Sequence, residues 1–372
     1  MEKELGFMLN AIKPQNETLP EEKKPVAIST VGRARAVKFE TVPGHDFWTD
    51  GTVSLYFGNS LQCYSQWETP TVIVSDGAYG ILGFEGDTSD HLDMPNWYEP
   101  HIKAWSKYAT PQTTLWFWNS EIGWAAVHPV LERHGWRYVN ANQWNKGKAH
   151  IAGNVNTAKI RRFPVVTEMC VQYVLEAKVN NVTLQQWLYS EWKRTGLPAR
   201  LANDACGVKD VATRKYFDQG HLWYYPPPEM FQKMVDYANT HGAPEGRPYF
   251  SRDGSKPMTI EEWAGMRSKF YCPIGYTNVW DRNPLKGSER IRVPEVSGKA
   301  AHLNQKPLDL MRLIIEASSD VGDVVWEPFG GLFSAALAAK RTERRAFAAE
   351  LDPTYYQLGV ARFATPQRNL FD

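Results

Sequence analysis

Toward its C-terminal end the chain carries an apolar segment, a turn with two glycines and a helical segment, in the stretch GDVVWEPFGGLFSAALAAK at 322–340. This order predicts the strand–turn–helix unit of a doubly wound parallel sheet. Such turns open at the carboxyl ends of strands, where ligands bind, and Gly330 and Gly331 let a ligand approach the backbone closely. The next apolar segment ends in Glu350, about 20 residues after Gly330, a spacing at which a carboxylate accepts hydrogen bonds from a ribose.

The same turn lacks the G-x-G-x-x-G pattern that brings backbone amides to a pyrophosphate. It therefore favours a ligand that carries a ribose but no pyrophosphate. A plain tight turn followed by a solvated Glu350 is the alternative that this segment alone leaves open.

Short apolar segments alternate with helical segments in two separate parts of the chain, 49–178 and 291–372. This alternation predicts an α/β fold with a mainly parallel sheet. The alternation stops over 179–290, a stretch that includes three consecutive prolines and reads as an insert. Residues 1–48 show no apolar period and are interpreted as an N-terminal extension. The simplest arrangement is one α/β domain split by an insert.

The composition of the chain excludes several classes of function. Lys and Arg number 42 against 41 Asp and Glu, so any contact with a polyanion must come from a local patch. The four cysteines lie far apart without a C-x-x-C pair, which indicates neither a metal site nor a disulfide framework and favours a reducing cytoplasm. No run of about 18 apolar residues and no apolar leader occur, so neither a membrane-spanning helix nor a signal peptide is predicted.

A second candidate site follows the apolar segment TVIVS, where Asp76 and Tyr79 stand in the run DGAY. A carboxylate and an aromatic ring at the carboxyl end of a strand can hydrogen-bond to and stack on one planar ligand, such as a base. An Asp-Gly turn that merely ends the strand is the alternative.

Taken in order, these and further motifs form a recognisable series. They are Gly58-Asn59-Ser60-Leu61, Asp76-Gly77-Ala78-Tyr79, Trp144-Asn145-Lys146, Thr167-Glu168, Val279-Trp280-Asp281, Gln305-Lys306-Pro307, Glu327-Pro328-Phe329-Gly330-Gly331 and Glu350. With this series the chain resembles the amino-group DNA methyltransferases, of the adenine-N6 or cytosine-N4 type. The order is the permuted one, in which the catalytic half precedes the S-adenosylmethionine half.

The resemblance implies a Rossmann-like sheet that binds S-adenosylmethionine, with a mainly helical target-recognition region inserted at 179–290. It implies methyl transfer to the exocyclic amine of a base flipped out of double-stranded DNA. Catalysis would fall to Asp76, the backbone carbonyl of Gly77, and Tyr79 stacked on the base. The cofactor would be bound by Asn59, Lys306, Glu327, Phe329, Gly330, Gly331 and Glu350.

The chain departs from the family pattern at three places. Gly77 and Ala78 replace two prolines, Glu327 replaces the opening aspartate of the cofactor motif, and Phe333 replaces its third glycine. The first departure removes backbone rigidity next to the catalytic carbonyl, although the carbonyl itself remains. An active enzyme is therefore expected.

Two further hypotheses remain beside DNA methylation: a DNA-binding protein that has kept the fold without activity, and a methyltransferase that acts on RNA or on a protein amide. Between the two bases, Asp76 resembles the adenine enzymes, while Ser75 before it keeps cytosine open. The resemblance further suggests a cytoplasmic, nucleoid-associated enzyme, in restriction-modification or as an orphan. It leaves open a homodimer and a cognate restriction endonuclease.

Two segments are candidate DNA contacts. Between Glu132 and Glu168 the chain has no acidic residue, and this run predicts a surface that faces a polyanion, an ordinary solvated face being the alternative. Its basic residues are Arg133, Arg137, Lys146, Lys148, Lys159, Arg161 and Arg162.

The second segment is LPARLANDACGVKDVATRKYF in the insert, which predicts two short helices around Gly207. It resembles a helix-turn-helix, whose second helix reads base edges in the major groove. That helix would present Lys209, Thr213, Arg214 and Lys215.

Overall fold

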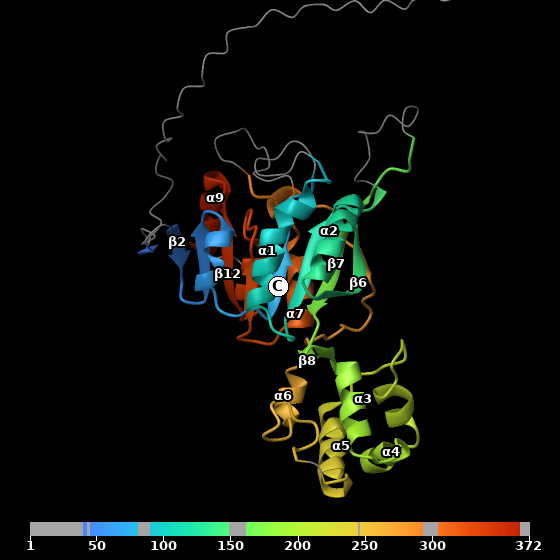
Figure 1. Cartoon of the computed structure of the whole chain (residues 1–372). Helices are drawn as coiled ribbons and strands as arrows, with labels where there is room; N and C mark the ends of the chain where they lie inside the picture. The colour runs from blue at the N-terminus through green and yellow to red at the C-terminus, as the bar shows by residue number, and fades with distance from the viewer. Residues whose placement is uncertain are drawn as a thin grey trace, which may run out of the picture. The chain divides into compact units, whose positions relative to one another are not determined.

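The computed structural model describes residues 40–42, 45–80, 90–148, 161–244, 246–292 and 304–364 (Figure 1). Its largest element is a ten-stranded sheet with the strand order β1-β2-β3-β12-β11-β4-β5-β7-β6-β10. The strands are β1 (Glu40–Val42), β2 (His45–Thr49), β3 (Val53–Phe57), β4 (Val72–Ser75), β5 (Thr114–Asn119), β6 (Trp136–Asn145), β7 (Thr167–Leu175), β10 (Val279–Asp281), β11 (Val324–Glu327) and β12 (Arg345–Glu350). The two short strands β8 (Lys178–Val179) and β9 (Val182–Thr183) form a separate hairpin.

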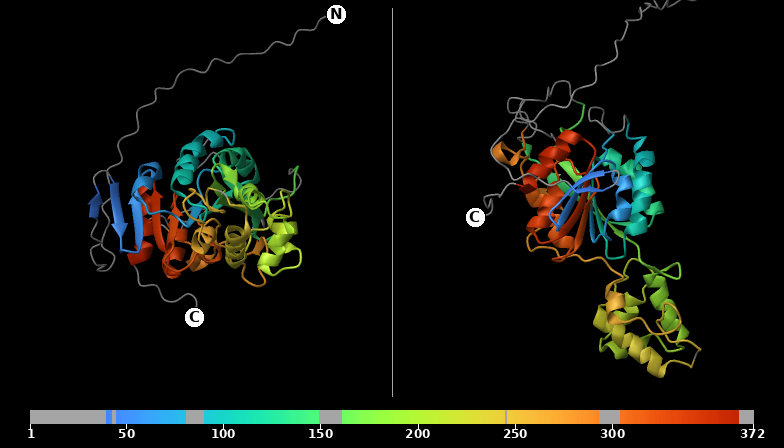
Figure 2. Two further views of the ribbon diagram at one scale, coloured as in Figure 1. Left: turned by 60° about the horizontal axis from the view of Figure 1, so that its bottom comes forward. Right: turned by 90° about the vertical axis from the view of Figure 1, so that its left-hand side faces the viewer.

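The central strands β3, β12, β11, β4 and β5 are parallel neighbours, while β7 runs antiparallel between β5 and β6. The right-hand view of Figure 2 shows helices on both faces of this sheet. On one face lie α1 (Met94–Tyr108) and α2 (Glu121–Arg133), and on the other lie α7 (Leu308–Ser318) and α8 (Ser334–Arg341). The predicted Rossmann-like α/β fold is confirmed.

The amphipathic pattern of α1 shows why the helices cover the sheet. Its buried residues Tyr98, Ile102 and Trp105 recur at helical spacing and pack into the main core with Phe117 of β5. At the start of α2 the side chain of Ser120 accepts a hydrogen bond from the Gly123 amide, which caps the helix. The remaining elements of the sheet domain are the 3₁₀ turns η1 (Ser60–Gln62), η2 (Tyr64–Gln66) and η5 (Gly287–Glu289), and α9 (Pro353–Ala364).

The two halves of the sheet domain interleave. Strands β11 and β12, from the C-terminal part of the chain, lie between β3 and β4. Trp326 of β11 pairs with Ile73 of β4, and Glu350 of β12 pairs with Phe57 of β3. Because these strands are parallel, the segments that follow β3, β4, β11 and β12 all emerge at one edge of the sheet, where the predicted site residues are found.

The insert has a hydrophobic core of its own, which extends from Ala177 to Met266 and includes Trp187, Phe231 and Trp263. It contains α3 (Leu184–Arg194), α4 (Arg200–Cys206), the π-helical turn η4 (Ala212–Tyr216), α5 (Pro228–His241) and α6 (Ile260–Ala264). The expected helical insert is therefore present.

At both outer boundaries the structure differs from the sequence interpretation. Strand β1 and all but the last residue of β2 lie within 1–48. There β2 pairs with β3, and Phe47 stacks on Tyr56 at 5.3 Å. Strand β10 lies within 179–290, because Trp280 pairs with Trp144 of β6. These three strands are short and lie at the two ends of the sheet, and segments of three to five residues are too short to show a period in the sequence.

Candidate active site

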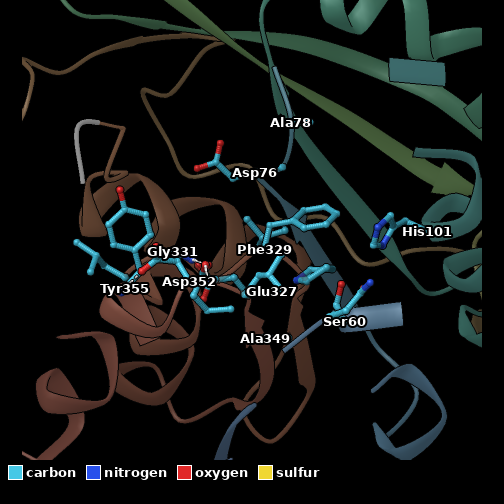
Figure 3. Close-up of a pocket in the computed structure, with 18 of the residues that line it drawn as sticks. Ser60, Asp76, Ala78, His101, Glu327, Phe329, Gly331, Ala349, Asp352 and Tyr355 are labelled. Carbon is cyan, nitrogen blue, oxygen red and sulfur yellow. Dashed lines mark hydrogen bonds between the residues drawn. The ribbon is translucent and has the colours of Figure 1, made fainter. Parts of the chain in front are cut away.

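A cavity of about 730 Å³ opens at the carboxyl ends of β3, β4, β11 and β12. Figure 3 shows Asp76 beside Phe329 and Glu327, with Gly331, Asp352 and Tyr355 on one side and Ser60 and His101 on the other. The structure brings every residue predicted for catalysis or cofactor binding to the wall of this cavity. They are Asn59, Asp76, Gly77, Tyr79, Lys306, Glu327, Phe329, Gly330, Gly331 and Glu350.

Asp76 is held by a buried lysine. The Lys306 ammonium donates hydrogen bonds to Asp76 Oδ1 at 2.6 Å and Oδ2 at 2.8 Å, and its side chain is 3% exposed. Burial alone would lower the pKa of Lys306, but Asp76 and Glu168 outweigh burial and raise it above its usual value. Lys306, which the sequence assigned to the cofactor, therefore orients Asp76 and keeps a positive charge beside it.

Glu168 of β7 completes this cluster, although it was absent from the predicted site residues. Its Oε1 lies 2.9 Å from Lys306 Nζ, and its Oε2 lies 2.7 Å from Lys146 Nζ. Burial raises the pKa of Glu168, but Lys306 and Lys146 outweigh burial and lower that pKa to about 2. The signal in the sequence was the Thr167-Glu168 pair before an apolar segment, which the resemblance included without a role.

Tyr79 bridges the two carboxylates. Its hydroxyl oxygen lies 2.8 Å from Asp76 Oδ1 and 2.7 Å from Glu168 Oε1, and Lys306 donates to it at 3.2 Å. Burial, Asp76 and Glu168 together raise the pKa of Tyr79 well above its usual value, so the phenol keeps its proton.

The Gly77-Ala78 segment is held by packing where the family pattern has prolines. The Ala78 carbonyl accepts hydrogen bonds from the Tyr98 hydroxyl at 3.0 Å and from Asn119 Nδ2 at 2.9 Å. A Cβ at Gly77 would lie 2.7 Å from the Phe329 ring and 2.8 Å from the Tyr98 hydroxyl oxygen. Neighbouring side chains therefore take the place of the rigid proline rings.

We expect restoration of proline at both positions, Gly77→Pro with Ala78→Pro, to destabilise the protein by about 1–3 kcal/mol. The added ring atoms must displace the Phe329 ring or the Tyr98 hydroxyl. Urea unfolding measures the change, with Gly246→Ala as the control because a Cβ there meets nothing within 4 Å. A double variant as stable as this control would show that the loop has room for side chains.

In the turn after β11, Phe333 and Glu327 both replace residues of the family pattern, and each has a defined structural role. Phe333 adopts the left-handed conformation at φ 55°, and its buried ring lies 2.2 Å from where a Cβ of Gly330 would stand. Phe333 precedes α8 but its side chain cannot cap the helix. The Glu327 carboxylate caps it instead, because it accepts hydrogen bonds from the backbone amides of Ala335 at 2.9 Å and Ala336 at 2.8 Å. Burial raises the pKa of Glu327 to about 8.

Glu350 connects two segments of the cavity wall. Its Oε2 accepts from the Gly331 amide at 2.6 Å, and its Oε1 accepts from the Asp352 amide at 2.7 Å. Burial raises the pKa of Glu350 to about 7 despite these two bonds. Asn59, on the wall formed after β3, accepts a hydrogen bond from the Leu61 amide at 3.0 Å and so fixes the 3₁₀ turn η1.

His101 of α1 also lines the cavity and was missed by the sequence. Its Nδ1 lies 2.9 Å from the Tyr64 hydroxyl, which also accepts a hydrogen bond from Trp105 Nε1 at 2.9 Å. Burial lowers the pKa of His101 to about 4, so the imidazole is neutral near pH 7. The only signal in the sequence was its place on the apolar face of a helix, which is common to buried histidines.

The basic residues between Glu132 and Glu168 differ in their surroundings. Arg133 forms an ion pair with Glu99, and Arg137 is exposed. Lys146 pairs with Glu168 and lies over the Trp144 ring at 4.6 Å, so its ammonium is engaged within the protein, and its DNA contact stays a prediction. Lys148, Arg161 and Arg162 are exposed as expected. Lys159 lies outside the described residues.

In the insert, α4 ends at Gly207, whose φ of 69° suits glycine, so the predicted break between two helical segments is present. The second segment, however, is a π-helical turn of five residues, which is shorter than a groove-reading helix. Lys209, Arg214 and Lys215 are exposed, whereas Thr213 faces Asn203, with 3.1 Å between its Oγ1 and Asn203 Nδ2.

Two kinds of feature are absent from the described part of the chain. No helix there is long and apolar enough to cross a membrane. No cluster of three or more histidine, cysteine, aspartate or glutamate side chains there could hold a metal ion.

A model of the DNA methylase family matches residues 71–361. The type II methyltransferase M.HinfI of Haemophilus influenzae is 35% identical over 85 residues, which make up 23% of this chain and 23% of that protein. The DNA adenine methyltransferase YhdJ of Escherichia coli is 38% identical over 61 residues, which make up 16% of this chain and 21% of that one. The chain thus matches less than a quarter of the length of these relatives.

Among solved structures, the cytosine-N4-specific PvuII DNA methyltransferase aligns over 87% of this chain and 89% of that one, with a TM-score of 0.48 and 13% identity. The M1.HpyAVI–SAM complex aligns over 84% of this chain and 98% of that one, with a TM-score of 0.46 and 14% identity.

Proposed function

Because the chain belongs to the DNA methylase family, we propose that it transfers a methyl group from S-adenosylmethionine to the exocyclic amine of a base in double-stranded DNA. One observation carries this proposal. Asp76 and Gly77, which follow β4, share a cavity with the two-glycine turn that follows β11, because β4 and β11 are parallel neighbours. An acceptor pair for an amine thus lies beside a turn suited to a ribose-bearing ligand.

The chemistry requires acceptors at the amine. An exocyclic base amine is a weak nucleophile, because its lone pair is delocalised into the ring. The Asp76 carboxylate and the Gly77 carbonyl accept its two N–H hydrogens and favour a pyramidal nitrogen with a free lone pair. Tyr79 stacks on the flipped base. We take adenine N6 as the target before cytosine N4, since an aspartate opens the tetrad.

The cavity wall fits S-adenosylmethionine, which supplies a methyl group on a positively charged sulfur. Glu350 has lone-pair capacity left beyond its bonds to backbone amides and can accept from ribose hydroxyls. The face of the Phe329 ring favours a cation. Gly331 lines the cavity without a side chain, and Asn59 also lines it.

We expect Glu350→Ala to weaken S-adenosylmethionine binding by about 10- to 100-fold, because a charge-assisted hydrogen bond contributes roughly 1.5–3 kcal/mol. In the wild type, binding should strengthen as pH rises through about 7, since ribose hydroxyls donate to the ionised carboxylate. The variant loses this part of the pH dependence. Calorimetry on both sides of that pH tests this, with Glu316→Ala as control because Glu316 forms a surface ion pair on α7. An unchanged dissociation constant would remove Glu350 from the cofactor site.

We propose that Lys148, Arg161 and Arg162 bind phosphates of the DNA backbone. Changing the three described residues to glutamine should weaken binding to every duplex and lower the log–log salt slope by about 0.9 for each phosphate that is no longer neutralised. Lys103 and Lys107 of α1, changed likewise, are the matched control because both are exposed on a helix outside this basic run. A salt slope equal to that of the control would place the DNA elsewhere.

The insert would then supply sequence selectivity, with Lys209, Arg214 and Lys215 as candidate readers. We expect Arg214→Ala and Lys215→Ala to change which sequence is methylated rather than to weaken all binding equally. Variants that alter only non-specific affinity would show that another part of the insert reads the bases.

The function itself is tested with tritiated S-adenosylmethionine, offered with duplex DNA, RNA or protein. Label in DNA, followed by digestion to nucleosides, distinguishes N6-methyladenine from N4-methylcytosine. Label only in RNA or protein would overturn the proposal, and no label would favour a DNA-binding protein without activity. The packing around Gly77 and Ala78 supports the active enzyme.

A further inference from the structure

The Tyr79 hydroxyl oxygen contacts Asp76 Oδ1 and Glu168 Oε1, and these two contacts share a single hydrogen. The hydroxyl of Tyr79 is 2.8 Å from one carboxylate and 2.7 Å from the other, and both distances are those of hydrogen bonds. A phenol carries one hydrogen and both carboxylates are acceptors only, so one of the two gaps has no proton. The Lys306 ammonium offsets this deficit, since it contacts all three groups.

The proposed reaction releases a proton that needs an acceptor. As the N–C bond forms and the S–C bond breaks, the positive charge passes from sulfur to the base nitrogen. That nitrogen must then lose one N–H hydrogen to regain its conjugation with the ring. A protonated base amine is a far stronger acid than a carboxylic acid, so proton transfer to Asp76 is downhill.

We propose that Asp76, Tyr79 and Glu168 form a relay that carries this proton away from the methylated base. The proposal rests on the proposed methyl transfer. Asp76 takes the proton, which fills the gap between its Oδ1 and the Tyr79 oxygen. The Tyr79 hydroxyl then accepts this proton while it passes its own to Glu168 Oε1. Glu168 finally releases a proton to water, and the three groups return to their starting state.

The surroundings of Glu168 suit the release of a proton to solvent. Its side chain is 13% exposed and ion-pairs with Lys146, which is 18% exposed, whereas Lys306 on the inner side is 3% exposed. Lys306 and Lys146 hold the pKa of Glu168 near 2 against the effect of burial, so a proton that arrives there is readily lost. The other titratable groups that face the relay are Cys170, whose pKa burial raises well above its usual value, and Glu327. Neither lies between the three oxygens.

The test uses Tyr79→Phe, which keeps the stacking ring and removes the hydroxyl. We expect the affinities for S-adenosylmethionine and duplex DNA to stay within about twofold and the steady-state turnover rate to fall about 10-fold or more, because Asp76 must lose its proton before each new methyl transfer. Added formate should restore part of the rate, because a small base can take the proton instead. Tyr108→Phe, at the end of α1, is the matched control.

A comparison of single and double variants shows whether Tyr79 and Glu168 act in one relay or independently. Glu168→Gln cannot take a proton, and the double variant with Tyr79→Phe should be no more than about twofold slower than the slower single variant, since members of one relay act as a unit. An active wild type with an equally active Tyr79→Phe overturns the relay alone. The relay is also overturned if formate does not restore the rate of Tyr79→Phe and if the rate reductions of Tyr79→Phe and Glu168→Gln multiply in the double variant. A wild type that transfers no methyl group to DNA removes the proposed function and the relay with it.

Discussion

Replacing Asp76 with alanine is expected to lower the methyl-transfer rate by about 100-fold or more, the usual effect of removing a hydrogen-bond partner that acts in the transition state. The affinity for S-adenosylmethionine should stay within a few-fold, because the proposed role of Asp76 concerns the base amine. The structure adds a second reason for the slower reaction. Without Asp76, Lys306 keeps its ion pair with Glu168 but no longer has two of its short hydrogen bonds.

Rapid-quench measurement of label transferred to a duplex in a single turnover gives the rate. Asp320→Ala is the matched control, since Asp320 is exposed, forms a surface ion pair with Lys269 and precedes β11 at the opposite edge of the sheet. A rate above about a tenth of wild type would show that Asp76 does not activate the amine.

The second large effect concerns stability. Lys306→Met should destabilise the fold by about 3–5 kcal/mol, because it leaves Asp76 and Glu168 facing each other across Tyr79 without their shared cation. Methyl transfer should be lost as well. Urea unfolding measures the change, with Lys340→Met as the control, because Lys340 forms a more exposed ion pair with Asp50. A destabilisation below about 1 kcal/mol, the range of a surface ion pair, would contradict a central role for Lys306.

The same cluster predicts an acid dependence with a definite sign. The pKa of Glu168 is lowered from its ordinary 4.5 to about 2 in the folded protein, so its contribution to stability is present above about 4.5. That contribution disappears as pH falls toward about 2. In Lys306→Met the pKa of Glu168 moves back up, and this part of the acid dependence should shrink.

The sequence predicted the α/β fold because apolar segments and helical segments alternate, and that pattern depends on local spacing alone. It also predicted which residues gather in the cavity, since residues that follow parallel strands emerge at one edge. It could not predict the partner of Asp76. Lys306 is 230 positions away along the chain, and only the folded sheet brings the two together.

Lys146 shows a second limit of prediction from the sequence. In the sequence it belongs to a basic run without acidic neighbours, which indicated a DNA-facing surface. In the structure β6 and β7 pair so that Trp144 lies opposite Glu168, and this register places the Lys146 ammonium on that carboxylate. The register of an antiparallel pair joined by a long connection cannot be inferred from local composition.

The interleaved strand order has a consequence for how the protein folds during synthesis. Strands β3 and β4 leave the ribosome early, but each lies beside a strand made near the end of translation. The Trp326 indole of β11, for example, donates to the carbonyl of Glu68, 258 positions earlier. Until β11 and β12 emerge, two apolar sheet edges stay unpaired, which slows folding and invites aggregation. A nascent chain stalled before β11 should therefore depend on chaperones, and two fragments divided within the insert should regain a complete sheet only when they are made together.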